Sequence, residues 1–211
     1  MNNMILRDLT YGVYVIGSKD GNRDVGCIAN SVMQITSNPA SIAISINHDN
    51  YTNKCIKECN KFSVSILNVD SNLKIIGTFG FSSSKDVDKF NDFDSEVIDG
   101  VSVVKDANGY IICDVVNVLE TETHTIFIGK VVSMNKFNDK IPMSYKYYHE
   151  VLKGSSSSKA PTYINNVVEE IKGSRWKCMI CGYIYEGNDL PLDYVCPICG
   201  QNREAFEKIE T

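Results

Sequence analysis

The sequence predicts a mainly β protein, in which an antiparallel barrel precedes a small metal-binding module. Short runs of apolar and small residues recur between residues 9 and 134 with few helical patterns between them, which is typical of an antiparallel barrel. Two Cys-x-x-Cys-Gly motifs occur near the C-terminus. A serine run at 155–158 lies between the two regions and is typical of a flexible connection. We therefore expect a barrel at 1–153, a linker at 154–173 and a module at 174–211.

The elements of the barrel follow from local patterns. Residues 41–46 alternate between apolar and small side chains, which predicts a strand with one buried face. A helix is expected at 52–60, where Asn60 ends it, and Asn108-Gly109 marks a turn. The same patterns predict strands at 9–17, 27–35, 62–67, 101–104, 110–120 and 124–134, helices near 72–78 and 161–172, a turn at 18–21, a polar loop at 36–39, and a loop with a short helix at 82–94.

Length and composition limit the classes of function. The 211 residues suit one domain of ordinary size and one small module, and 43% hydrophobic residues can build a core. A net charge of −5 argues against nucleic acid or an anionic membrane as partner. No apolar run approaches the length of a membrane span, and residues 1–8 lack the apolar core of a signal peptide. We therefore expect a cytoplasmic protein in which cysteines bind metal instead of forming disulfides.

Four of the eight cysteines have the spacing of metal ligands. Cys178 and Cys181 form one pair, Cys196 and Cys199 form the other, and fourteen residues separate the pairs. The two residues inside each pair let both sulfurs reach one ion from a single turn, and the glycine after each pair suits a backbone that needs positive φ. Four thiolates of this kind can form a tetrahedral shell around zinc or iron.

Aromatic residues surround the two pairs and favour iron. They are Trp176, Tyr183, Tyr185, Tyr194 and Phe206. In so small a module these rings keep water from the metal, which matters more to a redox metal than to a structural one. The stretch 174–209 resembles rubredoxin, although its segment between the pairs is shorter and Tyr194 stands where tryptophan is usual. The resemblance implies one rubredoxin-type iron ion. A structural zinc ribbon, which has nearly the same spacing, is the alternative.

The barrel lacks the common nucleotide-binding motifs. Neither G-x-G-x-x-G nor the P-loop pattern occurs, so a bound nucleotide would have to be held another way. Hydroxyl and amide side chains gather instead at 30–37 and 47–52, where strands are expected to end. Backbone amides at a helix start near Thr52 could hold a phosphate. On these residues alone, polar loops with helix caps are the simpler explanation.

A resemblance to a known family extends this interpretation. The stretches that carry it are 30–39, 44–47, 50–52, 62–67, 77–81, 88–90, 123–129 and 142–145. In this order they resemble the flavin reductase-like FMN-binding family, and the match covers about residues 5–165. The family implies a split β-barrel, usually a homodimer, with FMN near the dimer interface.

The resemblance also implies roles for individual residues. Those that would lie along the isoalloxazine ring and ribityl chain are Asn30, Ser31, Gln34, Thr36 and Ser37. Asn47, Tyr51 and Thr52 would lie near the phosphate, and Lys89 would neutralise its charge. His124 would face the flavin or an incoming nicotinamide, where its titration range suits proton transfer. The alternatives are a solvated lysine and a histidine that is bonded within its strand. The family often has glycine in the 82–84 loop, where this chain has serines.

The other cysteines are expected to be small buried residues. Cys55 and Cys59 share a helix face, but no further ligand is placed to complete a metal shell with them. The same expectation holds for Cys27 and Cys113.

Together the two regions suggest an electron relay. A flavin accepts two electrons and releases them singly, and an iron ion with four cysteine ligands carries one. We therefore expect an electron-transfer flavoprotein; the resemblance suggests an NADH-dependent reductase as donor and a flavodiiron-type oxygen or nitric oxide reductase as acceptor. One alternative is an NAD(P)H-dependent flavin reductase that releases reduced flavin. Another is a non-redox zinc ribbon attached to a barrel that has lost its FMN site.

Overall fold

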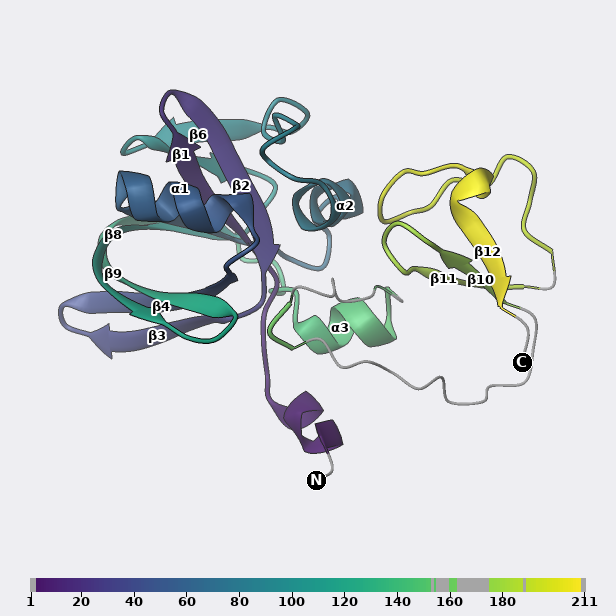
Figure 1. The fold of residues 1–211 in the computed structure, drawn as a ribbon, viewed down its shortest axis with the longest axis horizontal. Helices are drawn as coiled ribbons and strands as arrows, with labels where there is room; N and C mark the ends of the chain where they lie inside the picture. The colour runs from purple at the N-terminus through teal and green to yellow at the C-terminus, as the bar shows by residue number, and fades with distance from the viewer. Residues whose placement is uncertain (1–2, 153, 155–159, 163–174, 188, 210–211) are drawn as a thin grey trace.

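The computed structural model describes residues 3–152, 154, 160–162, 175–187 and 189–209. Figure 1 shows a β domain with a smaller unit beside it, and α2 (Leu73–Phe81) lies on the side of the β domain that faces this unit. The prediction of a mainly β fold with a separate cysteine-rich module is confirmed.

The β domain is built on one seven-stranded antiparallel sheet with the order β2-β1-β5-β8-β9-β4-β3. Its strands are β1 (Tyr14–Asp20), β2 (Arg23–Ala29), β3 (Val32–Ser37), β4 (Ala40–Asn47), β5 (Lys61–Ile66), β8 (Gly109–Glu120) and β9 (His124–Lys136). The hairpin of β6 (Ser95–Ile98) and β7 (Val101–Val104) forms a second, two-stranded sheet.

Neighbouring strands place their apolar side chains in one core. Ile16 of β1 lies opposite Val64 of β5, and Ile44 of β4 lies opposite Phe127 of β9. All four side chains are fully buried, as is Phe62. The alternation that predicted strand 41–46 therefore has the expected cause, since every second side chain of β4 faces this core.

Short helices cover the sheet. α1 (Tyr51–Cys59) starts at Asn50, whose side chain accepts a hydrogen bond from Thr52 N, and ends at Asn60 in the left-handed conformation with φ 54°. α2 starts in the same way at Asn72, and α3 is Tyr145–Glu150. The 3-10 helix η1 (Asn3–Asp8) precedes the sheet. No helix among the described residues is long and apolar enough to cross a membrane.

The small unit is a three-stranded sheet with the order β11-β10-β12. Its elements are β10 (Arg175–Cys178), β11 (Ile184–Glu186), the 3-10 helix η2 (Arg203–Ala205) and β12 (Phe206–Ile209).

Several boundaries differ from the sequence predictions. The single strand expected at 27–35 is wrong: β2 and β3 are separate strands, because they form the opposite ends of the sheet order and the chain must cross from one to the other at Asn30-Ser31. The first strand lies later than 9–17 and includes most of the expected turn, and β3 includes part of the expected loop at 36–39. β6 and α3 were not predicted, and the described loop 82–94 contains no helix.

Two predictions fall on the connection between the units. Most of the expected linker 154–173, and all but the first two residues of the helix expected at 161–172, lie outside the described residues.

Candidate functional site

The four predicted metal ligands converge at the end of the small unit. Their sulfur atoms all lie within 4.8 Å of one another. The Cys178 and Cys199 sulfurs are 3.6 Å apart, and those of Cys181 and Cys196 are 3.4 Å apart. A tetrahedral ion with metal–sulfur bonds of about 2.3 Å holds its ligands roughly 3.8 Å from one another. The cluster therefore has the dimensions of a four-thiolate metal site, and both separations are too long for a disulfide.

Two matching turns present the sulfurs. Gly182 N donates to Cys178 O at 2.7 Å, and Gly200 N donates to Cys196 O at 2.9 Å. The two glycines have φ of 73° and 71°, a region that other residues enter only with strain. The Cys181 thiol and nearby backbone N–H groups lower the pKa of Cys196, which favours the thiolate that binds metal at this position. Burial raises the pKa of Cys199 in the same turn to about 12.

Aromatic rings pack beside the cluster, as the sequence predicted. The Tyr194 ring lies 4.7 Å from that of Tyr185 and 5.4 Å from that of Phe206, both edge to face. Cys178, Cys181 and Cys196 are buried, and Cys199 is partly buried. The site is thus largely shielded from water, except near Cys199.

The β domain holds a cavity where α2 and α3 approach the sheet. Its volume is about 90 Å³, below the roughly 300–1,000 Å³ of typical ligand pockets, so a flavin would extend beyond it. The apolar part of its lining suits an aromatic ring system, and six side chains with amide or hydroxyl groups offer hydrogen bonds. The lining residues are Val13, Cys27–Asn30, Ser45–Asn47, Asn50, Ile76, Phe79–Phe81, Tyr145, Tyr148, Ala160 and Pro161.

Three asparagine side chains, each at the end of a strand or a helix, line this cavity. Asn30, after β2, is buried and its Nδ2 donates to Thr162 Oγ1 at 2.7 Å. Asn47 ends β4, and Asn50 caps α1. Of the predicted flavin contacts, Asn30 and Asn47 therefore line the cavity directly.

Two further predicted residues, Thr52 and Lys89, are buried polar groups. Thr52 Oγ1 has no hydrogen-bond partner among the described residues. Lys89 is 2% exposed, and its ammonium donates to the carbonyls of Gly26 and Phe79 at 2.9 and 3.1 Å. Burial lowers the pKa of Lys89 to about 8. The alternative of a solvated lysine is therefore wrong, and a buried cation of this kind is suited to a phosphate.

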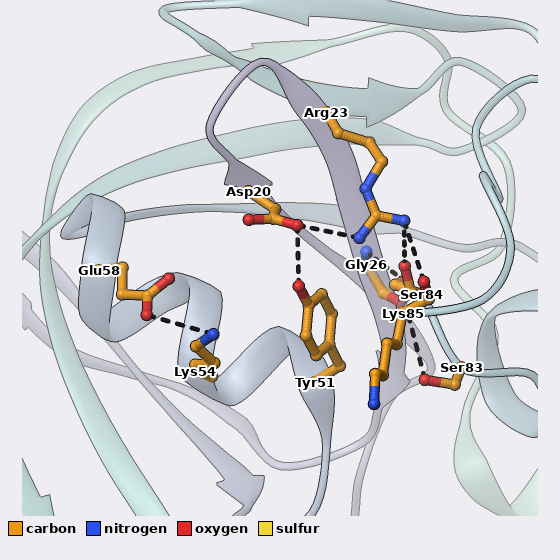
Figure 2. A network of polar contacts seen from close by, with 9 residues as sticks. All are labelled: Asp20, Arg23, Gly26, Tyr51, Lys54, Glu58, Ser83, Ser84 and Lys85. Atoms are coloured by element: carbon orange, nitrogen blue, oxygen red, sulfur yellow. Dashed lines mark hydrogen bonds and ion pairs between the residues drawn. The ribbon is translucent and has the colours of Figure 1, made fainter.

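Tyr51 is held by a polar network at the start of α1 (Figure 2). Its hydroxyl donates to Asp20 Oδ2 at 2.8 Å, and Arg23 Nη2 lies 3.0 Å from the same oxygen. Arg23 Nη1 donates to Ser84 O at 2.6 Å, so it ties the 82–85 loop to the β1–β2 hairpin. Ser84 Oγ also bonds both backbone groups of Gly26. Where the family often has glycine, Ser84 of this loop thus forms specific hydrogen bonds. Arg23 is a cation beside the loop that the sequence analysis did not identify.

The predicted contacts on β3 lie apart from the cavity. Gln34, Thr36 and Ser37 are exposed on this edge strand, and Thr36 Oγ1 lies 2.6 Å from Ser41 Oγ. Ser31 Oγ donates to Asn30 Oδ1 at 2.9 Å and so orients the amide that lines the cavity. Within one chain, the predicted flavin contacts on β3 therefore lie away from the other predicted contacts.

His124 lies next to the cavity without lining it. It starts β9 and pairs with Asn47 of β4 across the sheet. Its Nδ1 lies 2.8 Å from Thr123 Oγ1. His124 is therefore near the cavity through its pairing with Asn47, which lines it.

The remaining cysteines are structural, as expected. Cys27, Cys55 and Cys113 are buried, and Cys59 Sγ lies 3.0 Å from Ser18 Oγ. Burial raises the pKa of Cys55 to about 11 and that of Cys113 to about 12. These thiols are therefore held in their neutral form at ordinary pH.

Sequence reasoning missed a third wall of the cavity. Tyr148 of α3, Ala160 and Pro161 come from parts of the chain that no motif distinguished, and Tyr145, in the stretch 142–145 of the resemblance, was given no binding role. The six-residue length of α3 leaves too short a periodic pattern to identify from sequence.

Comparisons with known proteins agree with both sites. Residues 6–154 match the family model "Flavin reductase like domain", and residues 176–207 match "Rubrerythrin, rubredoxin-like domain". Over 99% of its length, the chain is 35% identical to a high molecular weight rubredoxin of Moorella thermoacetica, which is covered completely.

Two further relatives match the β domain. The chain is 34% identical to a ferric-chelate reductase (NAD(P)H) of Archaeoglobus fulgidus, over 75% of this chain and 95% of the relative. Among solved structures, the flavin reductase PheA2 in its native state is 28% identical, with a TM-score of 0.59 over 68% of this chain and 93% of the other.

Proposed function

The chain belongs to the flavin reductase-like family and carries a rubredoxin-like domain, and from this premise we propose that it relays electrons between FMN in the barrel and one iron ion in the module. Flavin binding, iron binding and electron transfer follow from the two families. The observation that carries the proposal is the convergence of four sulfurs within 4.8 Å on a chain that also holds the cavity lined by Asn30, Asn47 and Asn50.

Different residues of the barrel would bind different parts of FMN. Ile28, Ile76 and Phe79 exclude water from an aromatic ring, and Asn30 orients it by hydrogen bonds. Asn47, the buried ammonium of Lys89 and the hydroxyl of Thr52, which has no hydrogen-bond partner in the described part of the chain, would contact the phosphate. When bound, the flavin supplies the exchange between two-electron and one-electron chemistry.

A homodimer is part of the proposal. Seven large apolar side chains on three strands are exposed, and we call this set the apolar strand surface: Met33 and Ile35 on β3, Val116, Val118 and Leu119 on β8, and Val132 and Met134 on β9. Soluble monomers rarely leave such a surface in water. Pairing through it would bring the exposed polar residues of β3 to the interface, where the family places FMN.

The proposed partners are other redox proteins. Both families imply such partners. We propose an NADH-dependent reductase as donor and a flavodiiron-type oxygen or nitric oxide reductase as acceptor, on the resemblance alone.

A second candidate is an NAD(P)H-dependent flavin reductase. The similarity to a relative named as a ferric-chelate reductase (NAD(P)H) favours it. Such an enzyme would oxidise NAD(P)H without a protein donor.

One anaerobic experiment separates the candidates. Purified protein is analysed for flavin and iron, and its spectrum is followed after addition of NADH alone and then of NADH with a rubredoxin reductase. The relay predicts that the ferric-thiolate bands bleach together with the flavin when the reductase is present. Rapid flavin reduction by NADH alone, followed by release of the flavin, would favour the second candidate. Protein that contains neither flavin nor iron would refute both.

A further inference from the structure

Helix α2 contacts the flavin cavity on one side and the second cysteine turn on another. Ile76, Phe79 and Gly80 line the cavity. At Gly77 of the same helix, a Cβ atom would lie 2.3 Å from Ile198 O and 2.8 Å from Cys199 Cα. Real Cβ atoms do not approach so closely, so only glycine lets the metal-binding turn rest on the helix.

Tyr148 of α3 provides a second connection between the sites. It lines the cavity and is 3% exposed. Tyr148 also belongs to the same buried cluster as Cys181 and Cys196, so its ring lies in the core beside the sulfur atoms as well as at the cavity.

The two units share one apolar core at this contact. Ile75, Ile76 and Phe79 of α2 belong to the same buried cluster as Cys196 and Ile198 of the metal-binding turn. The helix and the turn are thus joined by a closely packed apolar contact.

We infer that this contact is the electron-transfer interface of the molecule, in which the turn Cys196–Gly200 docks on α2 and the iron faces the flavin cavity of its own chain. Gly77 is the positioning residue that permits the docking, and Ile76 and Tyr148 lie between the two sites. The inference rests on the proposed function. An electron that crosses here oxidises one centre by one electron and reduces the other by one, and no bond is made or broken.

The chain offers a matched pair of substitutions for the test. Gly77→Ala adds a methyl group against the backbone of the turn, whereas at Gly80 the added carbon meets only Ile28, at an ordinary 3.7 Å. Alanine is the better helix former at both positions, so neither change should unfold α2.

Two measurements on the full-length protein, loaded with iron and FMN, report on docking. The first is hydrogen exchange of peptides from α2 and from residues 196–200. The second is the first-order rate at which the centres exchange an electron after flash reduction. Because overpacking opposes the docked state, Gly77→Ala should accelerate exchange in both peptides and lower the electron-exchange rate roughly tenfold or more. Gly80→Ala should match the wild type in the hydrogen exchange of the 196–200 peptide, and it serves as the control for that measurement only, because Gly80 also lines the cavity.

Two results would contradict the inferred docking. If Gly77→Ala behaves like Gly80→Ala in hydrogen exchange and like the wild type in the electron-exchange rate, the docking interface is not the one assigned here. In mixed dimers of isotope-labelled and unlabelled chains, cross-links between α2 and the turn should join peptides of one label; links between labels would overturn the same-chain assignment. Hydrogen exchange and cross-linking need no flavin, so they still decide the docking if flavin is absent and the relay itself fails.

Discussion

At the scale of single residues, Lys89 has the most unusual environment in the barrel. Its ammonium is buried between two backbone carbonyls, and the described residues provide no carboxylate within ion-pair distance. In the free protein the charged form is therefore disfavoured, and the pKa falls to about 8. The cost of this charge is present below pH 8 and is relieved as pH rises towards the unfolded pKa of 10.5.

The first prediction follows from this pKa. A bound phosphate stabilises the charged lysine, so FMN should bind the protonated form and its affinity should fall above pH 8, by up to roughly tenfold per pH unit. Fluorescence titration of FMN between pH 6 and 9.5 measures this. Riboflavin, which lacks the phosphate, is the control and should show no such decrease, and neither should FMN with Lys89→Met. Parallel profiles for FMN and riboflavin in the wild type would contradict the assignment of Lys89 to the phosphate.

The second residue-scale prediction separates ligand cysteines from structural ones. Cys199→Ala removes one of four sulfurs that converge within 4.8 Å, so iron content and the ferric-thiolate absorption should be lost while the barrel keeps its flavin. Cys59→Ala is the control, because Cys59 is also partly buried but bonds Ser18 and lies outside the cluster. Elemental analysis and the visible spectrum provide the measurement. Undiminished iron in Cys199→Ala would show that the cluster is not the iron site.

At the scale of elements, the N-caps of α1 and α2 use the same chemistry in different surroundings. Asn50 Oδ1 accepts from Thr52 N at 3.0 Å, and Asn72 Oδ1 accepts from Lys74 N at 3.0 Å. Only Asn50 also lines the cavity. The start of α1 therefore combines a helix cap with a place in the cavity wall.

The third prediction tests this difference. Asn50→Ala and Asn72→Ala should each lower the free energy of unfolding by about 1 kcal/mol, because each removes one cap. Asn50→Ala alone should also weaken FMN binding, since it removes a polar group from the cavity wall. Chemical denaturation of the flavin-free protein and flavin titration give the two quantities. Equal flavin affinities in the two variants would place Asn50 outside the binding site.

Local patterns determined which elements could be predicted. The alternation at 41–46 and the Cys-x-x-Cys-Gly turns depend on neighbouring residues, and both occur as expected. The break at Asn30-Ser31 depends on where β2 and β3 lie in the sheet order, which no window of sequence contains. For the same reason the contribution of Tyr148 to the cavity was not predictable, because tertiary packing alone brings α3 to it.

The roles expected for individual residues also depend on tertiary packing. Asn30 and Asn47 line the cavity, but the exposed Gln34 on β3 does not. The burial of Lys89 and its two carbonyl partners could be identified only in three dimensions. The resemblance thus named candidate side chains, and the folded structure shows what each of them contacts.

At the scale of the whole molecule, the apolar strand surface is the feature that a single chain leaves unexplained. β8 and β9 are neighbours in the sheet, and only β4 separates β9 from β3. Its exposed side chains therefore come from nearby strands, although consecutive residues such as Val118 and Leu119 point to opposite faces of β8. Val116 is 61% exposed and Met134 is 65% exposed, values that a second copy of the chain would reduce.

The last prediction concerns this surface. Val116→Arg should convert the proposed homodimer to monomer, because a charge without a partner at an apolar interface costs several kcal/mol, about 100-fold or more in the dimer dissociation constant. Val97→Arg is the control: Val97, on β6, is 55% exposed and belongs to the separate two-stranded sheet. Sedimentation velocity measures the oligomeric state, and flavin content is measured on the same samples.

The two readouts together test the role of β3 in the flavin site. If β3 reaches FMN only across the dimer interface, Val116→Arg should lose flavin as it becomes monomeric, and its iron content should be unchanged because the cysteine cluster is complete within one chain. Val97→Arg should remain dimeric and keep both cofactors. A monomeric Val116→Arg variant that retains full flavin would show that the cavity of one chain suffices, and that Gln34, Thr36 and Ser37 take no part in binding.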